Sequence, residues 1–318
     1  MLHQTPDALP ITPDPFMTPP PRISVVVPIY RRKESVLLLL ANIYQQEGVS
    51  FEVIVVDDCS PDDTADAIAA QFPAVKLLRN AVNAGPAVSR NRGVRVAKGE
   101  FIVGFDSDVT VPDRKLFDGI VATFAKYPRA TGLALRVVEP DGRTDDAPRW
   151  CHVLPIKYAE RHFETHYFSG TGYAFRRESM LSAKLFPEIL YMHYEEVELA
   201  LRILDAGGTI LHCPDLRVQH HVHPIAARSK IEIFYKPRNQ ILFSLACHSW
   251  PRVAAYLLPR VVYNFVQAVS HRHLNELGAA FLSARQLAPQ VLSQRAPLKP
   301  NTWRVIKRLK SPAWLNKS

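Results

Sequence analysis

The sequence predicts an α/β fold in which a largely parallel sheet is flanked by helices and followed by a helical extension. Three observations predict this fold. Apolar runs rich in Val, Ile and Phe alternate with helical stretches over the first hundred residues, acidic or aromatic residues follow three of these runs directly, and the chain becomes helical and basic after Ala226. Strands that alternate with helices at this spacing usually form parallel sheets with crossover helices.

The first half of the chain contains the expected elements of this sheet. The run ISVVVPI at 23–29 is continuous and β-branched, as expected of a strand that is buried on both faces. Further strands are expected at 51–56, 75–78 and 101–105, and helices at 34–46, 62–71 and 86–97. Each of these helices lies between two strands, which is the order of a doubly wound sheet.

The second half is less regular. Residues 128–178 show no sustained period and are dense in aromatic, His and Gly residues, which predicts loops and short strands over a pocket. A helix is expected at 195–205, ended by Gly207 and Gly208, and further helices at 231–249 and 253–270. Because Pro259 and Arg260 interrupt the most apolar stretch, no clean membrane span is predicted.

Composition and cysteine usage exclude several classes of protein. With 318 residues, 47% hydrophobic and 22% charged, the chain is an ordinary soluble globular protein. Residues 1–21 hold seven prolines and no lysine or arginine, so they are expected to form a flexible N-terminal segment rather than a signal peptide. The cysteines form no CxxC pair, which argues against a zinc cage or disulfide framework and favours reduced thiols in the cytoplasm. They are Cys59, Cys151, Cys213 and Cys247.

The net charge of +9 is unevenly distributed. From Ala226 onward there are 15 Lys and Arg residues against two acidic residues, Glu232 and Glu276. The first 225 residues hold 24 basic and 28 acidic residues. A basic tail on a mildly acidic body predicts a polyanionic partner for the tail, either a membrane surface or a nucleic acid.

Polar residues follow three of the predicted strands at the point where each strand ends. Tyr30 follows the first, Asp57 and Asp58 the second, and Asp106 and Asp108 the fourth. Because ligands of open α/β sheets bind beyond the carboxyl ends of the strands, these residues are expected to converge on one site.

Asp106 and Asp108 are the central feature of that site. Two carboxylates so close together resist joint ionisation unless a cation lies between them. Oxygen ligands suit Mg²⁺ or Mn²⁺, and such an ion stabilises a diphosphate leaving group. The alternative is that both aspartates only form the turn after the strand.

Two neighbouring segments can likewise be interpreted either as part of a binding site or as ordinary turns and helix starts. Asp57 and Asp58 can present a carboxylate to a base or ribose, while Ser60 or Asp62 caps the next helix. Further on, Gly85 precedes a helix that carries Arg90, and the start of this helix favours phosphate. Arg90 is expected to pair with phosphate or with a strand-end aspartate.

Four segments, taken in order, resemble family 2 glycosyltransferases of the GT-A fold. They are SVVVPIY at 24–30, VVDDCSPDDT at 55–64, NAGPAVSRNRG at 83–93 and FDSDV at 105–109. The similarity runs from about Arg22 to His223, and it implies a GT-A domain at 22–225 followed by a basic helical region at 226–318.

The resemblance implies roles on the donor side. Pro28 and Tyr30 would flank the nucleobase, with Tyr30 stacked on it, and Asp58 would accept a hydrogen bond from the N3 proton of uracil or thymine. Asp106 would bind the nucleoside side of the donor, and Asp108 would ligate Mg²⁺ or Mn²⁺. The remaining donor-side residues would be Asp57, Asn83, Gly85 and Arg90. Cys59 stands where this family usually has glycine; cysteine is small enough that no loss of function is expected, although the turn itself could differ.

The resemblance also implies an acceptor side and a catalytic base. Gly170, Thr171 and Gly172 would form the acceptor loop. The segment EEVEL at 195–199 is similar to a motif that supplies the base, which falls on Glu196 or, one residue earlier, on Glu195. Glu198 is assigned only to complementing the helix dipole.

Histidines near the end of the domain complete the site. His220 would join the metal shell, whereas His221 and His223 are alternatives in a segment that could equally be a solvated turn. In the segment YKPRN at 235–239, Arg238 would contact the diphosphate or brace its helix.

The sequence therefore predicts an inverting glycosyltransferase that moves a sugar from a UDP- or dTDP-sugar to a glycan or lipid-linked glycan. Glu196 would deprotonate the acceptor hydroxyl for a direct displacement. The basic tail would dock on the anionic inner face of the cell membrane, and no nucleic acid partner is expected.

Three rivals are weaker. A nucleotidyltransferase that makes sugar nucleotides would carry a Gly-rich loop after the first strand, whereas PIYRRK at 28–33 has no glycine. A dinucleotide oxidoreductase fails for the same reason. A nucleic-acid-binding protein would show salt-sensitive affinity for DNA or RNA without sugar transfer.

Overall fold

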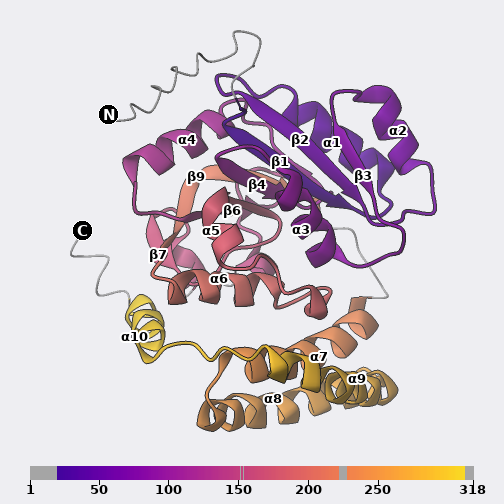
Figure 1. The fold of residues 1–318 in the computed structure, drawn as a ribbon, viewed down its shortest axis with the longest axis vertical. Helices are drawn as coiled ribbons and strands as arrows, with labels where there is room; N and C mark the ends of the chain where they lie inside the picture. The colour runs from indigo at the N-terminus through magenta and orange to yellow at the C-terminus, as the bar shows by residue number, and fades with distance from the viewer. Residues whose placement is uncertain (1–19, 151, 153, 222–227, 312–318) are drawn as a thin grey trace, which may run out of the picture.

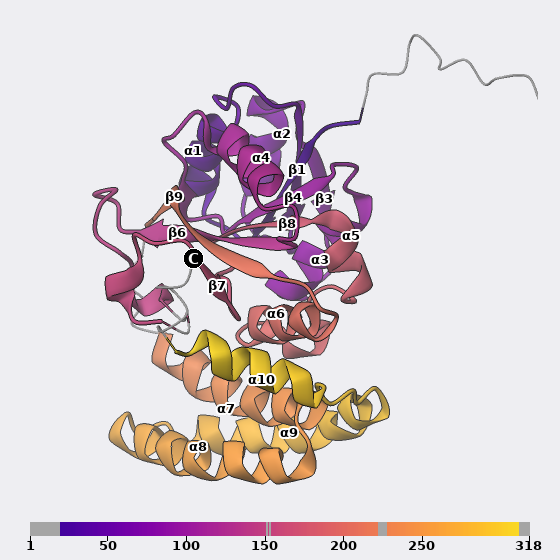
Figure 2. The ribbon, with the colours of Figure 1, turned by 90° about the vertical axis from the view of Figure 1, so that its left-hand side faces the viewer.

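The computed structural model describes residues 20–150, 152, 154–221 and 228–311. Most of the expected flexible N-terminal segment, together with Cys151 and His223, lies outside these ranges. A sheet domain lies above a bundle of helices formed by the end of the chain (Figures 1 and 2). The boundary expected at 225/226 falls in the undescribed stretch 222–227, so the division into domains stays a prediction.

The sheet domain is built on one mixed sheet in the order β3-β2-β1-β4-β8-β6-β9-β5, with β7 paired to β9. Its strands are β1 (Ile23–Ile29), β2 (Phe51–Asp57), β3 (Lys76–Arg79), β4 (Phe101–Phe105), β5 (Val109–Thr110), β6 (Gly132–Val138), β7 (Phe163–Thr165), β8 (Gly172–Arg176) and β9 (Ile210–His220). The pairs from β3 to β4 are parallel, β8 is antiparallel to both β4 and β6, and β6 is parallel to β9. The predicted α/β class is confirmed.

Helices cover both faces of the sheet. On one face, α1 (Lys33–Ile43), α2 (Thr64–Gln71) and α4 (Leu116–Lys126) pack against the odd side chains of β1, such as Val25 and Val27. On the other, α3 (Pro86–Val96), α5 (Arg177–Ser182) and α6 (Glu195–Asp205) pack in the cluster that contains Val26. Every residue of β1 is buried, because alternate side chains enter the two cores.

The middle of the chain departs most from the sequence-based expectation. Residues 128–178 were expected to form only loops and short strands, but β6 runs for seven residues. Its pattern is hidden because Arg136 lies within it, buried and bonded to Asp145 at 2.7 Å. The 3₁₀ turns η1 (Ala147–Arg149) and η2 (Ile156–Tyr158) follow, and η3 (Glu188–Leu190) precedes α6.

The helical region consists of α7 (Arg228–Cys247), α8 (Trp250–Ser270), α9 (Leu274–Ser293) and α10 (Pro300–Leu309). Leu242 of α7 and Ala284 of α9 share a core with Leu190 of the sheet domain. The last helix, α10, returns to α6, where Thr302 Oγ1 donates to Asp205 Oδ1 at 2.5 Å. The two regions therefore pack on one another through η3, α6, α7 and α10.

The helix α8 contains Pro259, as the expected helix at 253–270 did. A proline inside a helix removes the bond from its own nitrogen to the carbonyl four residues earlier and crowds that carbonyl. Here that carbonyl belongs to Ala255, which is exposed, so water can replace the lost donor. Among the described helices, none is long and apolar enough to cross a membrane.

Candidate active site

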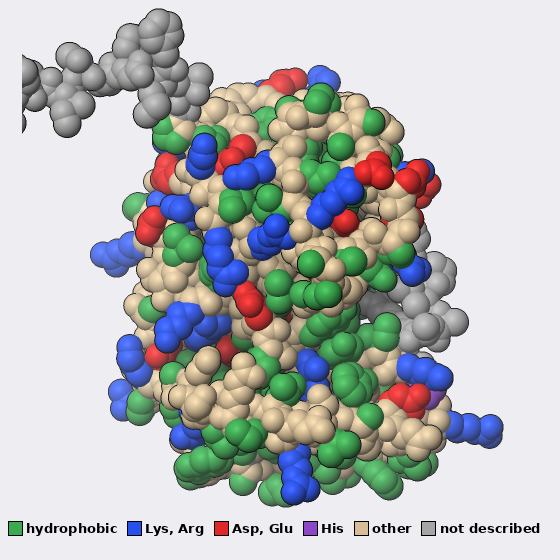
Figure 3. Space-filling model, turned by 45° about the vertical axis from the view of Figure 1, so that its right-hand side comes forward, with side chains coloured by type: hydrophobic (Ala, Val, Ile, Leu, Met, Phe, Trp, Pro, Cys, Tyr) green, Lys and Arg blue, Asp and Glu red, His purple; other side chains and the backbone are tan. Residues whose placement is uncertain are grey.

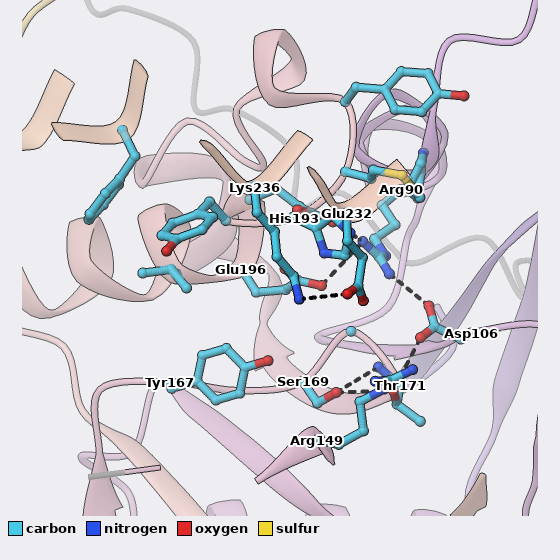
Figure 4. A pocket seen from close by; sticks show the side chains of 18 of the residues that line it. Arg90, Asp106, Arg149, Tyr167, Ser169, Thr171, His193, Glu196, Glu232 and Lys236 are labelled. Atoms are coloured by element: carbon cyan, nitrogen blue, oxygen red, sulfur yellow. Dashed lines mark hydrogen bonds and ion pairs between the residues drawn. The ribbon is translucent and has the colours of Figure 1, made fainter. Parts of the chain in front are cut away.

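A cavity of about 1170 Å³ lies at the carboxyl ends of β1 and β4 (Figure 4). Its walls come from both regions of the molecule. Tyr30, Asp58 and Asp106 line it from the sheet, Glu196 from α6, and Lys236 from α7. The expected convergence of strand-end residues on one site is therefore observed for Tyr30, Asp58, Asp106 and Asp108.

Arg90 is the centre of this cavity. Its Nη2 lies 2.7 Å from Asp106 Oδ1, and its Nη1 lies 3.1 Å from Glu195 Oε1 and 3.7 Å from Glu196 Oε1. Burial alone would lower the pKa of the guanidinium, but Asp106 and the two glutamates outweigh it and raise the pKa, so Arg90 stays charged. One buried cation thus joins α3, the end of β4 and the start of α6.

The two adjacent glutamates differ in exposure. The Glu195 side chain is 3% exposed, and its Oε2 is buried without a hydrogen-bond partner. The Glu196 side chain is 15% exposed and points into the cavity (Figure 4). Burial is the main cause that raises the pKa of both carboxyl groups, and for Glu195 the neighbouring Glu196 raises the pKa further. Both side chains line the cavity, and Glu196 is the more accessible of the two.

Gly170 leaves the room in which Arg90 and Glu196 meet. A Cβ atom at this position would lie 2.4 Å from Arg90 Nη2 and 2.6 Å from Glu196 Oε1. The adjacent Thr171 donates from Oγ1 to Asp106 Oδ2 at 3.2 Å. In the loop before β8, Thr171 thus positions Asp106, and Gly170 leaves room for Glu196.

A second group of charges surrounds Asp108. Arg32 Nη1 lies 2.7 Å from Asp108 Oδ2, and His220 Nε2 lies 3.7 Å from Asp108 Oδ1. The Nδ1 of His220 is paired with Asp146 Oδ2 at 2.6 Å. Burial opposes ionisation of Asp108, but the hydrogen bond and charge of His220 and the charge of Arg32 lower its pKa overall.

The donor atoms around Asp108 fit a divalent cation that also binds a diphosphate. In the part of the chain that the structure describes, no three His, Cys, Asp or Glu side chains are grouped so that they alone would hold a metal. Mg²⁺ sites commonly use one or two carboxylates and complete the shell with substrate phosphates and water. The His220 orientation, with Nδ1 on a carboxylate and Nε2 toward Asp108, is that of metal-binding histidines.

The end of the cavity beside Asp58 is shaped by the loop before α3. Asp58 accepts from the Asn80 side chain at 2.7 Å and from the backbone amides of Ala84 and Gly85 at 2.9 and 2.7 Å. Gly85 has a φ of 90°, and a Cβ atom there would lie 2.5 Å from the Tyr191 ring. The glycine therefore allows Tyr191 to reach across and donate from its hydroxyl to Asn83.

The segment before α6 has an unusual backbone that α7 holds in place. Tyr191, His193 and Tyr194 all have positive φ, which L residues seldom adopt. The buried amide of Asn239 donates to the carbonyls of Leu190, Met192 and His193 at 2.7–2.8 Å. A side chain of the helical region thus fixes the turn from which Glu195 and Glu196 project.

The family-model comparison decides the assignment. The model described as glycosyl transferase family 2 matches residues 24–182, half of the chain. The chain belongs to glycosyltransferase family 2. The curated relative "Succinoglycan biosynthesis protein ExoO" of Rhizobium meliloti is 41% identical over 134 residues, which are 40% of this chain and 38% of that protein. The chain thus spans well under half the length of that relative.

Two solved structures have the same fold as this family 2 member. A mannosyltransferase from Pyrobaculum calidifontis, solved with GDP-Man and Mn²⁺, aligns with a TM-score of 0.56 and 22% identity over 97% of this chain and 90% of its own. TarS 1-349 from S. aureus, solved with UDP-GlcNAc, aligns with a TM-score of 0.56 and 17% identity over 93% of this chain and 92% of its own. Both support the GT-A fold, including its helical extension.

Most of the candidate residues lie around the cavity. Those that line it are Pro28, Tyr30, Asp58, Asn83, Arg90, Asp106, Asp108, Gly170, Thr171, Glu195, Glu196 and His220. Gly85 does not line the cavity, but it leaves the space that the ring of Tyr191, which does line it, occupies. Asp57 and Gly172 do not line the cavity. Asp57 accepts from the Ser60 amide at 3.1 Å, which keeps it in the turn, and a Cβ on Gly172 would meet Val218 in the core.

Other family-implied details are also resolved. Cys59 has a φ of 62°, which explains why glycine suits this turn. Of the two roles considered for Arg238, the bracing role matches the structure, because its Nη2 donates to the Leu190 carbonyl at 2.7 Å and it does not line the cavity. The His221 ring lies with Nε2 2.8 Å from Thr110 Oγ1, and its backbone amide donates to the Asp108 carbonyl at 2.9 Å.

Sequence reasoning missed several residues that line or support the site. Arg32 pairs with Asp108, and Asp146 with His220, across 76 and 74 residues of chain. Lys236 and Glu232 of α7 reach the cavity and lie 3.2 Å apart. The one available signal was the basic run Arg31, Arg32 and Lys33 directly after the first strand.

Proposed function

We propose that the protein is a metal-dependent, inverting glycosyltransferase that transfers a sugar from a UDP- or dTDP-sugar to an acceptor hydroxyl. The observation that carries the proposal is the cluster around Arg90. It brings a strand-end carboxylate, Asp106, and a cavity-facing carboxylate, Glu196, to opposite ends of one guanidinium. A donor held by the first and an acceptor activated by the second would meet beside Arg90.

The donor would lie along the end of β1 and β4. Tyr30 is 42% exposed at the cavity edge, where its ring is available to stack on a pyrimidine. Asp58 already accepts three hydrogen bonds from the loop before α3. Its Oδ2 accepts only one of them, so it retains capacity for the N3 proton of the base.

Arg32 and Asp108 would bind the diphosphate end of the donor. A divalent cation held by Asp108 and His220 would neutralise charge on the departing diphosphate. Arg32 lies beside Asp108, where its guanidinium would contact a phosphate oxygen. Mn²⁺ in the structure of the Pyrobaculum mannosyltransferase supports a divalent cation in this one.

Glu196 would act as the base. In its ionised form it takes the proton of the acceptor hydroxyl as that oxygen attacks the anomeric carbon. The bond between the anomeric carbon and the diphosphate oxygen breaks, and the diphosphate leaves with the electron pair. Attack from the face opposite the diphosphate inverts the configuration. Arg90, which stays charged, keeps the carboxylate oriented throughout.

The acceptor class follows from the relatives and the charge of the chain. The name of the Rhizobium relative, a succinoglycan biosynthesis protein, supports a role in polysaccharide synthesis. The basic balance after Ala226 supports work beside an anionic membrane, at its cytoplasmic face, on a glycan or a lipid-linked glycan.

The test is donor hydrolysis and transfer by the purified full chain. A panel of UDP- and dTDP-sugars is screened by thermal shift with Mn²⁺, and the stabilising donors are then assayed for nucleotide diphosphate release. Release of UDP or dTDP that depends on Glu196 is expected. Formation of a nucleotide sugar from a sugar 1-phosphate and UTP or dTTP would instead identify a nucleotidyltransferase and overturn the proposal.

A further inference from the structure

The helix α8 has two different faces. Residues three or four apart along it, Arg252, Tyr256 and Arg260, line the active-site cavity from the side of the helical region. The residues buried in the rest of the helix are Val253, Asn264 and Ala268. Other positions of α8 are mostly exposed, so the helix contacts the remainder of the chain along a narrow stripe.

The cavity end beside α8 is aromatic. Tyr256 lies 4.7 Å from the His248 ring, and His248 lies 5.1 Å from Trp303 of α10. The Tyr256 hydroxyl donates to that of Tyr194, the residue before Glu195, at 3.3 Å. This end is thus continuous with the turn that carries the candidate base.

Three cations line the same end. Arg252 lies over the Trp303 ring at 4.5 Å, and Arg260 lies over Tyr256 at 3.6 Å. Lys310 also lines the cavity, and burial together with Lys310 lowers the pKa of the nearby His166 to about 4. Arg260 Nη1 donates to the Tyr256 carbonyl at 3.0 Å, but in the described part of the chain no carboxylate neutralises any of the three cations, and such cations around a cavity favour a phosphate group.

The opposite face of α8 is apolar and exposed. Leu258 is 69% exposed, Val262 65% and Phe265 55%. Val266 and Val269 extend the same surface. Hydrophobic side chains gather at this end of the molecule, with Lys and Arg between them (Figure 3). An exposed apolar surface this large usually marks a contact with a partner or a membrane.

The charge of this part of the chain favours an anionic membrane as the partner of the exposed face. After Ser249 the chain has eleven Lys and Arg residues and one acidic residue, Glu276. A surface that combines exposed aliphatic and aromatic residues with an excess of cations suits the interface of an anionic bilayer.

We propose that the α8 end of the cavity binds the phosphate of a lipid-linked acceptor, while the outer face of α8 lies in the bilayer that holds the lipid. This inference rests on the proposed glycosyl transfer, whose acceptor it assigns. One helix then separates the hydrocarbon chain from the reaction: Arg252, Arg260 and Lys310 hold the phosphate on the inner side, and Leu258, Val262 and Phe265 contact lipid on the outer side.

The first test measures binding of geranyl monophosphate to the full chain by calorimetry, with geraniol and inorganic phosphate as comparison ligands. No donor is added, so the result does not depend on sugar transfer. The variant Arg252→Gln/Lys310→Gln removes two exposed cations of the cavity. The control Arg285→Gln/Lys307→Gln removes two exposed cations of the same helical region outside it.

The wild type and the control are expected to bind geranyl monophosphate equally, and the cavity variant about tenfold more weakly or worse, a loss of roughly 1.4 kcal/mol or more. Equal losses in both variants would reduce the effect to net charge and overturn the site. So would geraniol or inorganic phosphate binding as tightly as geranyl monophosphate, or displacement of it by UDP, which would assign these cations to the donor.

The second test addresses the outer face. Val262→Asp/Phe265→Asp places charges at two exposed positions and leaves the cavity intact. The variant is expected to lose binding to phosphatidylcholine vesicles that contain phosphatidylglycerol, yet to bind geranyl monophosphate as the wild type does. Undiminished vesicle binding would overturn the orientation. A wild type that is dimeric in sedimentation and becomes monomeric in the variant would show that a second copy covers this face.

Discussion

The site contains two adjacent glutamates and one strand-end aspartate, and the fold shifts the pKa values of the two groups in opposite directions. Glu195 and Glu196 lie at the start of α6, where burial raises their pKa values. Asp108 lies after a strand, where Arg32 and His220 lower its pKa despite burial. The same functional group is thus prepared to accept a proton in one place and to stay an anion in the other. Burial opposes the charged form at both sites, so the difference depends on whether the neighbouring cations outweigh it: Arg32 and His220 do so at Asp108, whereas Arg90 does not at the two glutamates.

The largest expected effect comes from the strand-end carboxylates. Removing divalent metal with EDTA should reduce sugar transfer to background, and adding back Mn²⁺ or Mg²⁺ should restore it, because diphosphate charge would otherwise be unscreened. Asp108→Asn should remove turnover while the folded state persists. Transfer is measured as nucleotide diphosphate release, with thermal unfolding as the check on folding.

A matched control is Asp66→Asn, which makes the same change at an exposed side chain of α2. It should retain wild-type activity and metal response. Full transfer in EDTA, or an unaffected Asp108→Asn variant, would remove the distinction between the two glutamates and the strand-end aspartate.

Removing the proposed base is expected to lower activity slightly less than removing the metal or Asp108. Glu196→Gln should keep donor affinity but lower kcat by roughly two to four orders of magnitude, the usual contribution of a general base. Glu198→Gln is the control, because Glu198 lies in the same helical turn, pairs with Arg202 and does not line the cavity. If Glu195→Gln alone causes the loss, the base is one residue earlier; if neither does, α6 does not supply it.

An intermediate effect is expected from Gly170→Ala. The added methyl group would press on Arg90 and Glu196, and overpacking of this kind costs about 1–3 kcal/mol, or roughly ten- to hundredfold in rate. Gly278→Ala in α9 is the control, since a Cβ there meets nothing within 4 Å. Steady-state kinetics should show the loss in kcat/KM for Gly170→Ala only. Wild-type kinetics for both would mean that the Arg90 cluster adjusts freely.

The smallest effect sharpens the comparison through pH. Glu196 must be ionised to accept a proton, and its pKa is raised above the ordinary 4.5. Activity should therefore be full at a pH above the raised pKa and fall as the pH decreases through it. The loss should occur at a higher pH than it would for an exposed glutamate. The acidic limb should vanish from the residual activity of Glu196→Gln. A limb that persists in this variant belongs to another group.

The sequence pattern correctly predicted the strands and helices whose residues follow one regular pattern from end to end. The bounds 23–29, 101–105 and 195–205 agree with β1, β4 and α6, because each is an uninterrupted apolar or amphipathic run. The strand β6 was missed because Arg136 breaks its pattern and pairs with Asp145. Alternation of strand and helix likewise gave no sign that β8 would insert antiparallel beside β4.

The candidate site shows the same limit. Motif residues such as Asp106 and Glu196 lie on the cavity because each follows or begins a regular element. Residues that act only by meeting a distant partner, such as Asp146 beside His220, leave no local signal. Neither does the contribution of α7, whose side chains reach the site only after the two regions have packed together.

Asn239 has a practical consequence for experiments that divide the chain. Its amide donates to three backbone carbonyls ahead of Glu195, in a segment where three residues have positive φ. A fragment cut after Ala226 would keep every motif of the sheet domain and still lose the hydrogen bonds that hold the turn before Glu195 and Glu196. Helical regions exchanged between relatives to obtain new acceptors should therefore give active chimeras only where the incoming region carries an asparagine at this position.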